Sequence, residues 1–143
     1  MQMVMGKLNT QQKGQLAQLK VEQRALEKGC MVSRPTTDAR YDLIVDVGGK
    51  LQRVQIKYCS AKVSTSSGSF MVDLRRWAGD KRTVTRNYTK QEIDALMIYL
   101  PATDKVYRLP ASLVHEKSSI TLRVAPSSNG QHKGIRMASR YEW

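Results

Sequence analysis

The stretch from residue 41 to residue 57 reads as two alternating strands joined by the pair Gly48-Gly49. A glycine pair suits a two-residue hairpin turn, because such turns need positive φ angles. Counting outward from this turn places Asp42 directly opposite Gln55, and directly paired residues share one face of a sheet. Lys57 follows Gln55 on that face, because side chains alternate along a strand. The hairpin therefore predicts a carboxylate, an amide oxygen and an ammonium group at one sheet edge.

The chain is strongly basic. It has 143 residues, with 24 Lys and Arg against 12 Asp and Glu, and a net charge of +12. This length is enough for one compact domain with a hydrophobic core. The positive charge favours a polyanionic partner, because each neutralised phosphate releases counterions. Charge alone therefore indicates nucleic-acid binding but no chemistry, since non-enzymatic binders share it.

Cysteine usage and hydropathy bear on the compartment. Cys30 and Cys59 stand alone, without a CxxC motif or a histidine at ligand spacing, so we expect two buried, reduced thiols. The sequence has no apolar run long enough to cross a membrane and no recognisable signal peptide. Residues 1–9 read as a disordered leader. We therefore expect a cytoplasmic protein without a membrane partner.

The first predicted element is a helix that begins at Asn9 or Thr10 and runs to about Lys28, where Gly29 stops it. One stripe of this helix carries polar and apolar residues at helical spacing, namely Gln15, Leu19, Glu22 and Leu26. We expect the two leucines to pack on the sheet. The first-turn glutamine would then point toward the sheet edge.

The rest of the chain predicts short strands and turns. Residues 30–33 form a first strand, and 62–74 alternate around a polar turn as a second hairpin. Residues 89–92 match a capping box, but the apolar run that follows favours a short helical turn and then a strand. The later segments are expected as a basic loop over 77–88, strands over 95–100, 105–109 and 120–124, a short helix over 110–117, and a polar loop over 126–134.

The domain organisation follows from these segments. We expect one domain over residues 10–125. Residues 126–143 would form a loop and tail that contacts DNA or forms an oligomer, and the tail docks either on its own subunit or on a partner.

The predicted sheet edge offers groups that suit phosphodiester hydrolysis. Mg²⁺ prefers oxygen ligands, and Asp42 offers a carboxylate, Gln55 a side-chain carbonyl and Ile56 a backbone carbonyl. A metal there can polarise a phosphate and activate a water. Lys57 is suited to position that water or to offset phosphate charge. Each residue alone is usually structural or merely exposed, but their shared face on a basic chain favours a site.

Several short motifs, in this order and spacing, resemble the PD-(D/E)XK nuclease superfamily, and more narrowly the group I intron homing endonucleases of that class found in bacteria. The resemblance covers roughly residues 10 to 125. The motifs are Lys13-Gly14-Gln15-Leu16-Ala17, Gly29 with Val32-Ser33-Arg34-Pro35, Tyr41-Asp42-Leu43-Ile44, Arg53-Val54-Gln55-Ile56-Lys57, residues 93–101 and residues 106–110.

The resemblance implies an α/β fold with a restriction-endonuclease-like core, a mixed sheet flanked by helices. It implies cleavage of double-stranded DNA with Mg²⁺, for which Ca²⁺ or Mn²⁺ can substitute, in the bacterial cytoplasm. The metal-binding aspartate of the superfamily corresponds to Asp42 and its lysine to Lys57. The second acidic position corresponds to Gln55, which departs from the motif, although its carbonyl can still meet a metal.

The larger departure is Gln15, because related nucleases commonly carry a glutamate after the Lys-Gly of the first helix. With glutamine at positions 15 and 55, Asp42 would be the one carboxylate that contacts the metal. We therefore expect a weakened or inactive catalytic site, such as a deliberate Glu-to-Gln change would produce. The alternative is a natural glutamine that caps the helix or faces solvent.

Recognition of DNA is assigned to two segments. The polar hairpin 62–74 is a candidate ribbon for the major groove through Ser64, Ser66, Ser67 and Ser69, or else a plain soluble turn. The basic residues assigned to phosphates or guanine edges are Arg75, Arg76, Lys81, Arg82 and Arg86.

The resemblance also implies a homo-oligomer, a dimer or tetramer, on a long pseudo-palindromic site. The alternatives are a non-catalytic DNA-binding module on a nuclease fold, a Holliday-junction resolvase or a restriction-type nuclease.

Overall fold

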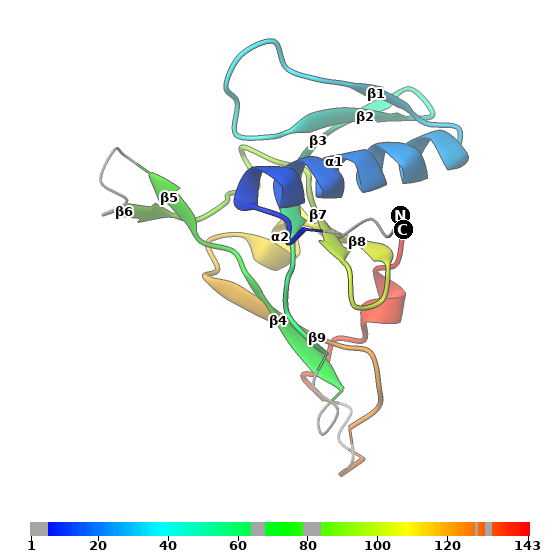
Figure 1. Cartoon of the computed structure of the whole chain (residues 1–143), viewed down its shortest axis with the longest axis vertical. Helices are drawn as coiled ribbons and strands as arrows, with labels where there is room; N and C mark the ends of the chain where they lie inside the picture. Colours follow the sequence, from blue (N-terminus) through cyan, green and yellow to red (C-terminus); the bar gives the residue numbers. More distant parts are fainter. Residues whose placement is uncertain (1–5, 64–67, 79–83, 128, 131–132) are drawn as a thin grey trace.

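A computed structural model describes residues 6–63, 68–78, 84–127, 129–130 and 133–143. Within these residues five strands form a mixed sheet in the order β1-β2-β3-β7-β8, with α1 across one face and the pair β4-β9 on the other (Figure 1). The elements are α1 (Thr10–Glu27), β1 (Met31–Ser33), β2 (Leu43–Val47), β3 (Lys50–Tyr58), β4 (Ser69–Asp73), β5 (Arg76–Ala78), β6 (Val84–Arg86), β7 (Ala95–Leu100), β8 (Lys105–Pro110), α2 (Ala111–Val114), β9 (Ser119–Arg123) and η1 (Ala138–Arg140).

The predicted hairpin is confirmed. β2 and β3 pair antiparallel with Val47 opposite Lys50. Gly48 and Gly49 have φ angles of 60° and 88°, which explains why two glycines stand at this turn. The local pattern of alternation and turn residues was therefore enough to set the register.

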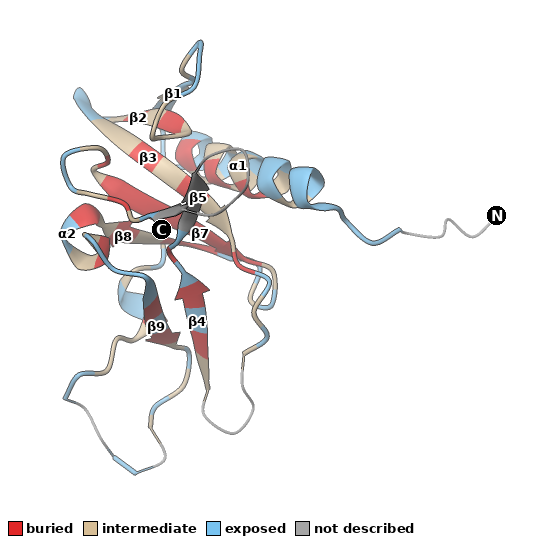
Figure 2. Ribbon diagram, turned by 90° about the vertical axis from the view of Figure 1, so that its left-hand side faces the viewer, coloured by how far each residue is buried: buried red, intermediate tan, exposed pale blue. Residues whose placement is uncertain are grey.

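The strand β7 is the centre of the fold and is buried along its whole length (Figure 2). It pairs parallel with β3 and antiparallel with β8. Because parallel strands need a long connection, the chain leaves β3, builds β4, β5 and β6, and only then enters β7. This crossover brings the second layer, formed by the pair β4-β9, next to the end of β3.

The helix α1 has the predicted bounds but buries a different stripe. Asn9 is the N-cap and forms a capping box with Gln12. The buried residues are Ala17, Val21 and Ala25, whereas the predicted contacts Leu19 and Leu26 are 49% and 64% exposed. The prediction was wrong because it followed the largest side chains. The actual contact uses small residues at i, i+4 and i+8, which let the helix lie close to the sheet.

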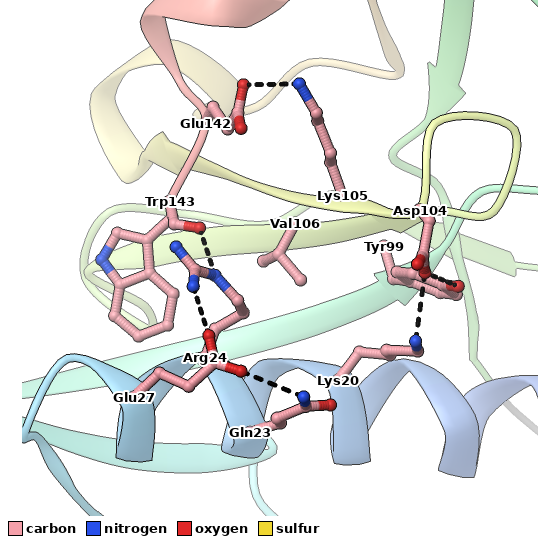
Figure 3. Close-up of a pocket in the computed structure, with 10 residues that line it drawn as sticks. All are labelled: Lys20, Gln23, Arg24, Glu27, Tyr99, Asp104, Lys105, Val106, Glu142 and Trp143. Atoms are coloured by element: carbon pink, nitrogen blue, oxygen red, sulfur yellow. Dashed lines mark hydrogen bonds and ion pairs between the residues drawn. The ribbon is translucent and has the colours of Figure 1, made fainter.

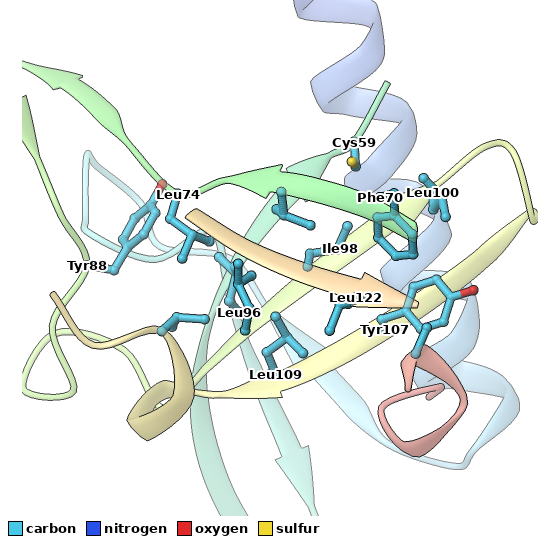
Figure 4. Packing of buried hydrophobic residues seen from close by; sticks show 14 of the residues in the cluster. Cys59, Phe70, Leu74, Tyr88, Leu96, Ile98, Leu100, Tyr107, Leu109 and Leu122 are labelled. Carbon is cyan, nitrogen blue, oxygen red and sulfur yellow. The ribbon is translucent and has the colours of Figure 1, made fainter. Parts of the chain in front are cut away.

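The second layer also differs from the sequence prediction. The predicted hairpin over 62–74 is wrong for its described second half, because β4 (Ser69–Asp73) pairs antiparallel with β9, whereas residues 64–67 lie outside the described residues. Buried Phe70 and Leu122 from this pair pack on Leu96, Ile98 and Leu109 of the main sheet (Figure 4). The predicted basic loop over 77–88 contains a second antiparallel pair, β5 with β6. Alternation identified β4 as a strand, but it could not identify a partner so distant in sequence.

The last residues pack on this same chain. The Arg108 N–H donates to the Tyr141 carbonyl at 2.7 Å, and the Trp143 N–H donates to the Val106 carbonyl at 3.0 Å. The side chain of Arg24 on α1 donates to the Trp143 carbonyl at 2.8 Å (Figure 3). The tail therefore lies along β8 and reaches α1.

The remaining predictions agree with the structure in outline. Residues 90–92 form a turn before β7, as expected. The predicted helix over 110–117 is shorter, since α2 ends at Val114 and Glu116 has a positive φ of 57°. Cys30 and Cys59 are buried free thiols, as expected. In the part of the chain that the structure describes, no helix has the length and apolarity of a membrane span.

Candidate active site

A groove runs between the first half of α1 and the start of β2. Its volume is about 630 Å³, and its lining includes Gln15, Asp42, Gln55 and Ile56. Two further hollows adjoin it, and Gln55 lines all of them. The predicted site residues are therefore brought to one continuous surface, with Gln55 at its centre.

Asp42 is fixed by the backbone of the neighbouring strand. Its N–H donates to the Val54 carbonyl at 2.8 Å, and its Oδ2 accepts the Ile56 N–H at 2.9 Å. In an extended strand the N–H and C=O of one residue point to the same side. The Ile56 carbonyl therefore faces the side on which Asp42 lies, so a carboxylate and a backbone carbonyl share that edge of β3.

Lys57 lies in the hollow that also contains Gln55 and Ile56. Its Nζ donates to the Arg75 carbonyl at 3.2 Å and lies 5.5 Å from the centre of the buried Tyr88 ring. The lysine thus shares a face with Asp42 and Gln55, as expected, but its ammonium group contacts the connection between β4 and β5. Gln55 lines both the hollow of Lys57 and the groove of Asp42.

Gln15 is exposed on the first half of α1 and lines the same groove as Asp42 and Gln55. The helix cap uses Gln12, so capping does not account for Gln15. Glu22, on the predicted stripe of α1, forms a two-point ion pair with Arg34, with distances of 2.8 and 2.9 Å. The groove therefore receives an amide where a carboxylate would add charge.

The donor types in the groove suit a hard divalent cation. A carboxylate from Asp42, amide carbonyls from Gln15 and Gln55, and the Ile56 carbonyl are all oxygen ligands of the kind that Mg²⁺ prefers. Their combined charge is low, and among the described residues no three His, Cys, Asp or Glu side chains cluster as a metal site. The donor types of the groove fit a divalent ion, and Asp42 is the one carboxylate among these ligands.

Several polar residues that line the site were not proposed as site residues from the sequence. Gln18 and Arg34 line the hollow beside Asp42, and Lys13 and Asp73 line the hollow of Lys57. Gln18 could have been found, because it follows Gln15 by three residues and so lies on the same side of α1. The others depend on contacts between distant segments.

The predicted DNA-contacting residues are described only in part. Arg75 follows β4 and lines the hollow of Lys57. Arg76 and Arg86 are paired positions of β5 and β6. The Arg86 Nη2 lies 3.7 Å from the Glu92 Oε2. Ser69 begins β4. The predicted contacts that lie outside the described residues are Ser64, Ser66, Ser67, Lys81 and Arg82.

The β5-β6 pair begins directly after Arg75 and ends just before Tyr88, and both of these residues line the hollow of Lys57. In Figure 1 this pair projects from the body of the protein. The structure therefore places a two-stranded pair beside the hollow of Lys57, where the sequence predicted a loop.

The solved structures that this chain resembles include a homing endonuclease and a junction resolvase. A bacterial homing endonuclease, I-Ssp6803I, is 28% identical with a TM-score of 0.73, and the match covers 94% of this chain and 89% of that one. Hjc of Archaeoglobus fulgidus, a Holliday junction resolvase, is 8% identical with a TM-score of 0.46, covering 78% of this chain and 84% of that one. A search of curated protein sequences found no significant match.

The sequence profile of one family extends over nearly the whole chain, from residue 8 to residue 143, and so includes the tail that packs along β8. The expected fold class, a PD-(D/E)XK core built on a mixed sheet, is confirmed. This chain belongs to the PD-(D/E)XK endonuclease family.

Proposed function

We propose that this protein is a metal-dependent endonuclease that cuts double-stranded DNA at a specific site. The observation that carries the proposal is the position of Asp42, whose Oδ2 accepts the Ile56 N–H and which lines an oxygen-rich groove. Gln55 and Lys57 continue this surface, and the chain has a net charge of +12. A hard cation and a phosphate are the ligands that suit such a surface.

In this proposal Asp42, Gln55 and the Ile56 carbonyl hold Mg²⁺, and Ca²⁺ or Mn²⁺ can take its place. A metal held by these residues would polarise the phosphate and lower the pKa of a water. Lys57 orients the attacking water or offsets the charge that develops on the phosphate. Asp42 keeps its orientation through its backbone hydrogen bond, so the ligand set needs little rearrangement.

The proposed substrate is a long, pseudo-palindromic duplex, read by a homo-oligomer in the bacterial cytoplasm. Support comes from the similarity to a bacterial homing endonuclease, and we propose that this chain also serves in group I intron homing. Arg75 and the ribbon of Arg76 and Arg86 contact phosphates or guanine edges. The same chemistry could act on a junction or a restriction site, because the fold does not determine the substrate.

Gln15 sets the expected level of activity. A second carboxylate in the groove would raise metal affinity, so we predict that Gln15→Glu increases Mg²⁺-dependent cleavage by orders of magnitude. The measurement is cleavage of a randomised duplex library, followed by sequencing of the cut ends. We expect one long, partly palindromic motif at those ends, and no cutting when Asp42→Asn is added to Gln15→Glu.

A second candidate function is a non-catalytic DNA-binding module. The low charge of the groove favours it, since Asp42 is the one carboxylate among the predicted ligands. The same experiment separates the two functions. If Gln15→Glu selects a motif by binding but cuts nothing in Mg²⁺ or Mn²⁺, the chain is a binding module and the proposed catalysis is wrong.

A further inference from the structure

β4 ends at an aspartate whose side chain closes a local turn with the backbone of Arg75. The Asp73 Oδ1 accepts the Arg75 N–H at 2.9 Å and the Arg75 Nε at 3.0 Å, and Oδ2 accepts Nη2 at 3.0 Å. A side-chain oxygen that binds the N–H two residues later closes a local turn. The same carboxylate therefore shapes the backbone at Arg75 and orients its guanidinium group.

The turn is anchored in the core between these two residues. Leu74 is fully buried, and its N–H donates to the Ser118 carbonyl at 2.9 Å. The residue before the turn, Asp73, also pairs with Ser119 in the β4-β9 ladder. The backbone from residue 73 to 75 is therefore fixed to the second layer, the pair β4-β9. The side chains around this backbone determine which of its groups face the groove.

The first group that this turn directs toward the groove is the Arg75 carbonyl, which accepts a hydrogen bond from Lys57 Nζ at 3.2 Å. Lys57 also lies 5.5 Å over the Tyr88 ring, which is only 2% exposed. Arg40 lies at the same distance from that ring and pairs with Glu92. Lys57 belongs to the main sheet, but its ammonium group is held by the second layer and by the segment before β7.

The second group that this turn positions is the Arg75 guanidinium group, which is exposed. Arg75 lines the same hollow as Lys57. Asp73 engages Nε and Nη2, so the Nη1 edge can donate to a phosphate oxygen. The hydrogen bonds from Arg75 lower the pKa of Asp73 to about 2, and the nearby charge of Lys57 contributes. The carboxylate is therefore charged at neutral pH.

We propose that Asp73 is a positioning residue for this site. It folds the turn so that the Arg75 carbonyl holds the Lys57 ammonium group in place, and it aims the Arg75 guanidinium group at a phosphate of the DNA backbone. The role of Lys57 in cleavage rests on the proposed function, but the contact between the turn and Lys57 can be tested without it.

Three variants separate the two tasks. Asp73→Ala removes both the turn contact and the ion pair. Asp73→Asn keeps an oxygen that can accept the Arg75 N–H but loses the charge. Arg75→Ala keeps the carbonyl that holds Lys57 and removes the guanidinium group. Should Asp73→Ala fail to fold by circular dichroism, Asp73→Gln replaces it, because its amide is one methylene too long for the turn.

The first readout is the rate at which an amine-specific reagent modifies Lys57, followed by mass spectrometry. We expect Asp73→Ala to speed modification of Lys57 several-fold, while Asp73→Asn and Arg75→Ala, which keep the Arg75 carbonyl in place, change the rate much less. Lys105, which lies on β8 and pairs with Glu142, is the internal control. An unchanged rate for Lys57 in Asp73→Ala would overturn the proposal.

The second readout is DNA cleavage and affinity in the Gln15→Glu protein. Asp73→Ala should slow single-turnover cleavage by about tenfold or more, because small misplacements of a catalytic group are costly. Arg75→Ala should weaken DNA binding and slow bound-state cleavage less. Equal effects of both variants on rate and affinity would contradict separate tasks. Faster Lys57 modification in a protein that never cuts would support the positioning contact and refute the proposed function.

Discussion

Replacing Lys57 by methionine tests whether this residue acts in the reaction or only in binding. Methionine keeps an unbranched side chain and removes the ammonium group that lies 5.5 Å from the centre of the Tyr88 ring and donates to the Arg75 carbonyl. DNA affinity should change little, because many basic side chains share the phosphate contacts of a chain with net charge +12.

The expected loss of rate can be worked out from the burial of the lysine. Lys57 is partly buried, so an effective dielectric constant of about 20 applies, and two unit charges about 4 Å apart then interact by about 4 kcal/mol. A charge that develops only in part in the transition state gains less, about 3 kcal/mol. This corresponds to a loss of rate of about 10²-fold.

The assay is single-turnover cleavage with protein in excess of DNA, in the Gln15→Glu protein, together with a binding titration without metal. Lys105→Met is the matched control, because this lysine is half exposed on β8 and pairs with Glu142. Were DNA affinity to fall as much as the cleavage rate, Lys57 would be a binding residue and the reasoning would be refuted.

Two further predictions concern stability. Val21→Ala should destabilise the fold by about 2 kcal/mol, since it removes part of the buried contact between α1 and the sheet. Leu26→Ala should change the stability by less than about 0.5 kcal/mol, because Leu26 is exposed. Chemical denaturation measures both variants, and equal losses would contradict the observed helix face. Asp73 has a pKa of about 2 in the fold against its usual 3.8, so its ion pair with Arg75 stabilises fully above pH 3.8 and is lost as the pH falls toward 2. Asp73→Asn should flatten that part of the stability curve by less than about 1 kcal/mol, because the pair is half exposed. An identical slope in the variant would exclude this pair as its source.

Local patterns predicted the parts of the fold that depend on neighbours in sequence. Gly48-Gly49 and the alternation around it set the β2-β3 register, and with it the shared face of Asp42 and Gln55. The caps of α1 were equally local. These features could be read from the sequence because turn and cap geometry depends on a few adjacent residues.

The features that failed depend on distant partners. Residues 69–73 read as half of a hairpin, but their partner is β9. The face of α1 was misjudged because alanines carry little hydrophobic signal, although they allow the closest approach to a sheet. The contact between Lys57 and the Arg75 carbonyl joins two layers through a turn, and neither residue alone indicates it.

The proposed function requires that the groove at Asp42 bind a divalent cation. Its most direct test is a Mn²⁺ titration of the ¹⁵N-labelled protein, because paramagnetic broadening falls steeply with distance and locates a weakly bound ion. We predict selective loss of the amide signals of Asp42, Gln55 and Ile56, which Asp104→Asn leaves unaffected and Asp42→Asn abolishes. Broadening that centres on another part of the chain, or that survives Asp42→Asn, would contradict it.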